Sequence, residues 1–142
     1  MKNSLRFLFK AIIALMLANN AAFAATDTKS LLSSGEAKLK AKDYTGAITD
    51  FTQALELNPK NAEVYLNRGL AKRSAGDIEG AKADFKSSIE VDPTPKDAAA
   101  YYQRGLAKSA LGDNNGALSD YKRAAAHGDA NAKTWLKDNG YK

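Results

Sequence analysis

Apolar residues recur along most of this chain at intervals that fit an α-helix. In one clear stretch, small or apolar side chains stand at Ala81, Phe85, Ser88 and Ile89. This i, i+4, i+7, i+8 spacing places all four on one face of a helix and leaves the polar residues between them facing solvent. No segment alternates apolar and polar residues with the period of two that is typical of a strand. The pattern therefore predicts an all-α protein.

The predicted helices come in pairs whose ends are marked by breaking and capping residues. Asn58-Pro59 and Asp92-Pro93 end the second helix of the first two pairs, because the residue before a proline disfavours the helical conformation. An aspartate that can cap each second helix stands at Asp43, Asp77 and Asp113. The expected pairs are residues 28–41 with 44–57, 61–75 with 78–91, and 97–111 with 114–127.

Glycine recurs in the first turn of the second helices, where it is unfavourable for helix formation. It stands at Gly46, Gly80 and Gly116. A close approach of neighbouring backbone would account for all three.

A last helix is predicted over residues 129–138. Its apolar side chains Ala132, Trp135 and Leu136 share one side, and Gly140 follows it. A helical array exposes an apolar face at its last repeat, which a terminal helix with one polar face can cover. We therefore interpret Trp135 as a packing residue rather than as an anchor for a ligand.

Three segments of the chain have similar sequences. They begin at Gly35, Gly69 and Gly105 and read GEAKLKAKDYTGAITDFTQALELNP, GLAKRSAGDIEGAKADFKSSIEVDP and GLAKSALGDNNGALSDYKRAAAHGD. The first two start 34 residues apart, and the third starts 36 residues after the second because two residues are added near Pro95. In every copy the glycine is followed by an alanine and then by an aromatic residue: Ala47 and Phe51, Ala81 and Phe85, Ala117 and Tyr121.

This period and this order of residues resemble the tetratricopeptide repeat. The resemblance extends from Thr28 to about His127 and implies an α-solenoid of three helix hairpins. The repeats would span about residues 28–61, 62–95 and 98–128, followed by a capping helix at about 129–138. The third copy has Asp129 in place of the closing proline, and its run AAAHGDANAK is similar to a Sel1-type junction.

Charged residues recur at fixed positions of the repeats. Arg68 and Arg104 stand where the family favours leucine (the first copy has Ser34), and each is followed 16 residues later by an aspartate, Asp84 or Asp120. This constant offset favours an ion pair within each repeat over an anion-binding site. Lysine replaces a favoured tyrosine at Lys38, Lys72 and Lys108. We expect the lysine stems to lie over the seam between the helices with their amines in water; a row of cations for an acidic partner is the alternative.

The first 24 residues have the composition of a secretory signal peptide. Lys2, Arg6 and Lys10 precede an apolar core at residues 11–18, and residues 22–24 form an A-x-A cleavage site. A retained membrane anchor is the alternative, but Asn19 ends the apolar run, whereas a membrane span needs about 20 apolar residues. We expect cleavage near Ala24 and export of the mature chain to a bacterial periplasm, or its secretion.

The net charge gives no indication of a nucleic-acid partner. The chain has 21 Lys+Arg against 16 Asp+Glu, for a net charge of +5. Without residues 1–24 the balance is 18 basic against 16 acidic residues, or +2. That excess is too small to favour a polyanion. We also expect no insertion of the mature chain into a membrane.

The sequence offers no candidate catalytic residue, metal site or cofactor site. It has no cysteine and a single histidine, His127, so neither a Cys-His pair nor a His/Cys metal cluster can form. Phosphate-binding glycine motifs and the nucleophile motif G-x-S-x-G are also absent from the sequence. We therefore expect a protein that is not an enzyme.

The resemblance implies that the first helices of the repeats line a concave face where partners bind. Helical spacing places eight residues of the second and third repeats there: Leu66, Asn67, Leu70, Arg73, Tyr102, Gln103, Leu106 and Ser109. The equivalents in the first repeat are Lys29, Leu32, Glu36 and Lys40. Apolar side chains would supply affinity, and the amides could bond the backbone of an extended peptide or a partner helix. Packing between adjacent first helices explains the leucines equally well.

Family members that bind a chain-terminal carboxylate use a set of lysine, asparagine and arginine on these helices. Only Asn67 matches that set here, whereas Leu32, Glu36 and Ala99 do not, so this ligand mode is not expected. We expect an exported, non-catalytic adaptor or scaffold that binds a protein or peptide partner. The alternative is a structural unit that self-associates into homo-oligomers through the open face of its first repeat.

Overall fold

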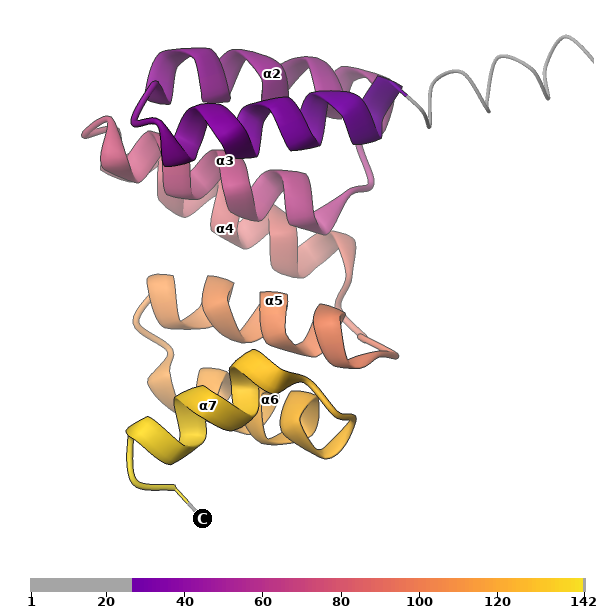
Figure 1. Cartoon of the computed structure of the whole chain (residues 1–142), viewed down its shortest axis with the longest axis vertical. Coiled ribbons are helices and arrows are strands. Elements are labelled where there is room, and N and C mark those ends of the chain that lie inside the picture. The colour runs from indigo at the N-terminus through magenta and orange to yellow at the C-terminus, as the bar shows by residue number, and fades with distance from the viewer. Residues whose placement is uncertain (1–26, 142) are drawn as a thin grey trace, which may run out of the picture.

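The computed structural model describes residues 27–141, which form helices joined by short turns (Figure 1). The first described helix comprises residues 27–40. The others are α2 (Tyr44–Leu57), α3 (Ala62–Ser74), α4 (Ile78–Val91), α5 (Ala98–Ala110), α6 (Asn114–Ala126) and α7 (Ala130–Asp138). No strand occurs in this part of the chain, so the predicted all-α solenoid with a terminal helix is confirmed. The predicted signal peptide lies outside the described residues.

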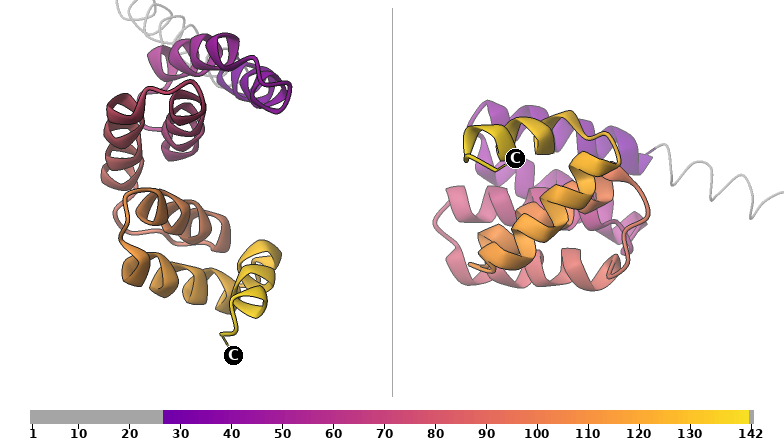
Figure 2. Two further views of the ribbon diagram at one scale, coloured as in Figure 1. Left: turned by 90° about the vertical axis from the view of Figure 1, so that its left-hand side faces the viewer. Right: turned by 90° about the horizontal axis from the view of Figure 1, so that it is seen from below.

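The helices pack as hairpins, and the hairpins stack into a curved array (Figure 2). Each second helix also contacts the first helix of the next repeat, as α2 contacts α3 and α4 contacts α5. The first helices α3 and α5 contact each other directly and lie on the inner side of the curve. We call this surface of the first helices the inner face.

The second helices begin at the predicted aspartates. Asp43, Asp77 and Asp113 accept hydrogen bonds from the backbone N–H of Gly46, Gly80 and Gly116 at 3.0, 2.9 and 2.9 Å. A Cβ atom on these glycines would lie only 2.0–2.2 Å from a carboxylate oxygen of the capping aspartate. The recurring glycines therefore leave space for the capping carboxylate, and the explanation by a neighbouring backbone was wrong.

The turns between the helices of each hairpin need one residue in the left-handed conformation. Gly76 and Gly112 supply it in the second and third repeats with φ of 92° and 86°. The first repeat has Lys42 at this position with φ of 65°. A side chain with a Cβ atom is strained in this region, and glycine is not.

Lys42→Gly is therefore expected to stabilise the protein by about 0.5–1 kcal/mol. Glycine relieves the strain of the folded turn, although part of this gain is offset by the greater freedom of the unfolded chain. Urea unfolding followed by circular dichroism measures the change. Gly112→Ala, at the equivalent turn, should have the opposite sign; a Lys42→Gly variant less stable than wild type would contradict this explanation.

The two helices of each hairpin approach closely at a glycine that faces an aromatic ring. A Cβ atom on Gly69 would lie 2.6 Å from Cε1 of Phe85 and 3.2 Å from the carbonyl oxygen of Ala81. Gly35 meets Phe51 and Gly105 meets Tyr121 in the same way, at 2.5 and 2.6 Å. The aromatic ring is thus the nearest neighbour of each of these glycines, and at Gly69 the backbone of Ala81 comes next.

Helix α7 packs on the end of the third hairpin. Its Ala132 is fully buried, and the ring of Trp135 lies 4.5 Å from that of Tyr121 between centroids. Trp135 is half-buried and also stacks on Tyr141 with a centroid distance of 6.0 Å. These contacts confirm the interpretation of Trp135 as a packing residue.

Candidate functional site

The arginines that recur in the repeats form paired hydrogen bonds with buried aspartates. Arg68 donates to Asp84 from Nε and Nη2 at 2.9 and 2.7 Å, and Arg104 donates to Asp120 at 2.8 and 2.6 Å. Each arginine also reaches the preceding repeat: Arg68 bonds the Thr52 hydroxyl at 3.3 Å, and Arg104 bonds the carbonyl of Pro93. The predicted ion pair within each repeat is confirmed, and the guanidinium donors are already used within the fold.

Each recurring lysine binds the aspartate of its own repeat. Lys72 lies 2.9 Å from Asp84, Lys108 lies 2.8 Å from Asp120, and Lys38 lies 2.7 Å from Asp50. The expectation that these amines extend into water was therefore wrong. In the first repeat Ser34 replaces the arginine and donates to Asp50 at 2.6 Å.

These contacts control the ionisation of Asp120 and Asp50. Burial by itself would raise the pKa of Asp120, but hydrogen bonds from Arg104 and Lys108 outweigh it and hold that pKa below its ordinary value. The pKa of Asp50 is lowered in the same way, with burial opposed by the hydrogen bonds of Lys38 and Ser34. Asp120 and Asp50 are thus stable anions within their hairpins and serve the fold.

Little in the described residues suggests reactive chemistry. His127 follows α6 as its C-terminal cap, and its ring stacks on Tyr101 with a centroid distance of 5.6 Å. Within residues 27–141 no group of three His, Asp or Glu side chains is placed to hold a metal ion. Within the same residues no helix is long and apolar enough to cross a membrane.

The structure places the eight predicted site residues on α3 and α5, where their burial differs. Leu66 is 3% exposed and packs with Ala81, Phe85 and Ala107, so for this leucine the packing explanation holds. Leu70 and Leu106 are half-buried at the edge of the same core cluster and remain partly accessible. Arg73 and Ser109 are exposed, and Gln103 is half-buried.

Two of the predicted residues have specific partners. Tyr102 is half-buried, with its ring 5.7 Å from that of Tyr121 between centroids. Asn67 donates from Nδ2 to the Glu36 carboxylate at 3.1 Å, which joins α3 to the first described helix. Glu36 is the first-repeat equivalent that sequence spacing placed on the same face.

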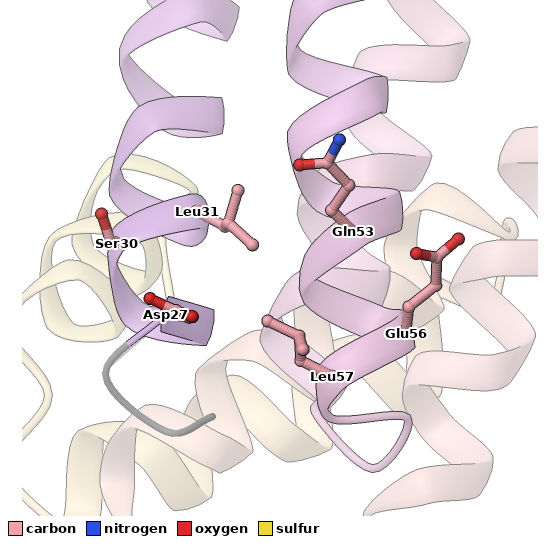
Figure 3. A pocket seen from close by; sticks show the side chains of 6 residues that line it. All are labelled: Asp27, Ser30, Leu31, Gln53, Glu56 and Leu57. Atoms are coloured by element: carbon pink, nitrogen blue, oxygen red, sulfur yellow. The ribbon is translucent and has the colours of Figure 1, made fainter. Parts of the chain in front are cut away.

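A hollow that sequence reasoning missed lies on the first hairpin, between the helix of residues 27–40 and α2 (Figure 3). It is lined by Asp27, Ser30, Leu31, Gln53, Glu56 and Leu57. Leu31 and Leu57 face the space between the two helices, and Leu57 is 43% exposed.

Aligning the first repeat with the second could have predicted where this hollow lies. Ser30 occupies the place of Val64 in the second repeat, which is fully buried against Ala47 and Phe51 of the repeat before it. The hollow is therefore the surface that a preceding repeat would cover. The polar Ser30 makes it poorly suited to such stacking.

Family models match most of the described chain. A model described as "TPR repeat" matches residues 35–72, and one described as "Tetratricopeptide repeat" matches residues 62–95 and 98–126. The chain belongs to the tetratricopeptide repeat (TPR) family. No curated protein sequence is a significant match to it.

Solved TPR domains are similar to this TPR chain along most of its length. The Sgt2 TPR domain from Aspergillus fumigatus is 31% identical with a TM-score of 0.57, over 78% of this chain and 75% of that one. The Arabidopsis OM64 TPR domain is 26% identical with a TM-score of 0.56, over 81% and 95% of the two chains. The second TPR domain of human RPAP3, solved with the HSP70 peptide SGPTIEEVD, is 26% identical with a TM-score of 0.56, over 84% and 99%.

Proposed function

We propose that the inner face of this TPR array binds a protein or peptide segment without catalysing a reaction. The observation that carries the proposal is the partly accessible apolar surface of Leu70, Leu106 and Tyr102 on neighbouring first helices. Leucine and aromatic side chains next to exposed polar groups are suited to holding an apolar side chain of a partner. The peptide bound by the similar human RPAP3 domain supports this kind of ligand.

The polar residues of this face support an extended or helical ligand. Gln103 and Ser109 are accessible on α5, and Arg73 is exposed on α3. Their amide, hydroxyl and guanidinium groups could bond the backbone of a ligand that crosses the two helices. Leu66 has no part in the proposed contact, because it is buried in the core.

Because the chain has no cysteine, the proposal can be tested by blocking one face at a time. Peptides selected from a random dodecamer phage library on the purified chain would be assayed by fluorescence anisotropy. Ser109→Cys carrying a maleimide–polyethylene glycol is expected to lose binding by at least about thirtyfold, since an apolar anchor is typically worth about 2 kcal/mol. The same protein before labelling loses only the Ser109 hydroxyl and should bind within about fivefold of wild type.

Ser119→Cys is the matched control, because Ser119 is also exposed but lies on the second helix α6. Labelling there should leave binding unchanged. If labelling on α6 abolishes binding and labelling on α5 does not, the ligand binds on the outer face, which the second helices form. Circular dichroism on each labelled protein verifies that the helices are retained.

The alternative of self-association predicts a different result. A structural unit that pairs through its first repeat would use the hollow beside Leu57, which is 43% exposed. Its molar mass in solution would rise with concentration, and Leu57→Lys would abolish that rise. We propose the binding module instead because Ser30 makes this end surface polar.

We propose further that the protein acts after export and that residues 1–24 are removed. Support comes from the charged start, the short apolar core and the A-x-A motif of those residues. N-terminal sequencing of the protein purified from whole bacteria should find Ala25 as the first residue. A folded product that still begins at Met1 would contradict both the cleavage and the periplasmic location.

A further inference from the structure

Two carboxylates lie close together on the inner face, where the first and second repeats meet. Asn67 of α3 bonds Glu36 of the preceding first helix at 3.1 Å. Glu63 stands one helical turn before Asn67, so its side chain leaves α3 on the same side. Both glutamates are half-buried. The two repeats thus bring two acidic side chains to the same part of the inner face.

This pair is not neutralised within the described residues. Neither glutamate belongs to any ion pair of residues 27–141. Lys29 and Lys40 are exposed on the helix of Glu36 without bonding either glutamate, and Arg73 lies over the ring of Phe85 at 5.8 Å. Burial and the nearby charge of Glu36 raise the pKa of Glu63. An arrangement that opposes folding in this way is typical of a surface kept for binding.

The carboxylates adjoin the apolar part of the same face. Glu63, Leu66 and Leu70 follow one another along α3, and both Leu70 and Leu106 of α5 pack at the edge of the same core cluster. A ligand that covers Leu70 and Leu106 and continues toward the first repeat would reach Glu63 on α3 and Glu36 on the helix of residues 27–40. Its side chains at that point would be most stable if they carried positive charge.

We propose that the partner of this inner face is a peptide segment in which a lysine or arginine lies next to an apolar residue. The cation would bind between Glu36 and Glu63, and the apolar side chain would contact Leu70 and Leu106. This inference rests on the proposed function and specifies the chemistry of the ligand. The RPAP3 domain was solved with SGPTIEEVD, which has adjacent acidic residues, so the charge preference would be the reverse.

Glu36→Gln combined with Glu63→Gln tests the proposal with little effect on folding. Glutamine at position 36 can still accept the hydrogen bond from Asn67, and the variant removes a repulsion. Dodecamers selected on the wild-type chain should be enriched in Lys or Arg beside an apolar residue. Their Kd for the double variant should be about tenfold higher than for wild type. The control is Glu79→Gln with Glu90→Gln, two exposed carboxylates of α4, which should change Kd less than about twofold.

The charge preference can also be reversed. Glu36→Lys combined with Glu63→Lys should favour a version of the selected peptide in which the Lys or Arg is replaced by Glu, because both carboxylates that face the cation are then replaced by amines. Selected peptides without a preference for cations, or equal Kd values for wild type and the double glutamine variant, would overturn the inference. If labelling of Ser109→Cys still blocks those peptides, the inner face remains the binding site and only the ligand chemistry is wrong. If that labelling also has no effect, the proposed function fails with it.

Discussion

Gly69→Val is expected to lower the free energy of unfolding by about 3 kcal/mol, at the upper end of the usual cost of overpacking a core. A Cβ atom there would lie 2.6 Å from the ring of Phe85, which is 1% exposed and cannot move aside freely. It would also lie 3.2 Å from the backbone carbonyl of Ala81, so the two helices of the hairpin must separate. Urea unfolding followed by circular dichroism at 222 nm measures the loss.

The control for Gly69→Val is Ala83→Val on the exposed face of α4. It introduces the same β-branched side chain into a helix without a neighbour and should cost about 0.5 kcal/mol. Combining Gly69→Ala with Phe85→Leu should recover part of the loss caused by Gly69→Ala, because the smaller side chain yields space. A Gly69→Val protein as stable as the control would show that the two helices do not meet at this point.

Asp120→Ala is expected to destabilise the protein by about 3 kcal/mol, near the lower end for breaking a buried ion pair. The Asp120 side chain is 2% exposed, and its loss leaves Arg104 and Lys108 without their anion. Asp50→Ala should cost less, because Lys38 is 39% exposed and Ser34 takes the place of the arginine. Urea unfolding should therefore give a lower free energy of unfolding for Asp120→Ala than for Asp50→Ala. The reverse order would contradict the role assigned to Arg104.

The same carboxylate makes stability depend on pH. The pKa of Asp120 is lower in the folded than in the unfolded chain. The ionised carboxylate therefore contributes fully to stability at pH values above its pKa in the unfolded chain, about 4. This contribution is lost as the pH falls from there through the folded pKa. The thermal midpoint of wild type should drop more steeply between pH 5 and pH 3 than that of Asp120→Asn. Parallel curves for the two proteins would contradict the assignment.

Features that recur from one repeat to another could be predicted from the sequence. Asp77 and the Asn58-Pro59 pair act on their own neighbourhood of the chain, so they fix the ends of helices without knowledge of the packing. The pairing of Arg68 with Asp84 followed from a constant offset of 16 residues. The offset of 12 residues between Lys72 and Asp84 is equally constant and could have shown where the lysine amine binds.

Features that occur once could not be predicted in this way. Glu36 and Glu63 come from different repeats and lie 27 residues apart, without counterparts elsewhere in the array. Their proximity depends on how two hairpins stack, which no local pattern states. Whether Leu66 or Leu70 is accessible likewise depends on the packing of α5 against α3. Helical spacing alone gave both leucines the same face, and the structure buries only one of them.

The central claim is that ligands bind on the inner face, and mapping of amide chemical shifts tests it most directly. Titration of the ¹⁵N-labelled chain with a peptide selected on it should shift the amide signals of α3 and α5, with the largest changes around Leu70 and Leu106. The amide signals from the exposed faces of α4 and α6, such as those of Lys86 and Ser119, should not shift. Shifts confined to α4 and α6, or to the hollow beside Leu57, would contradict the claim.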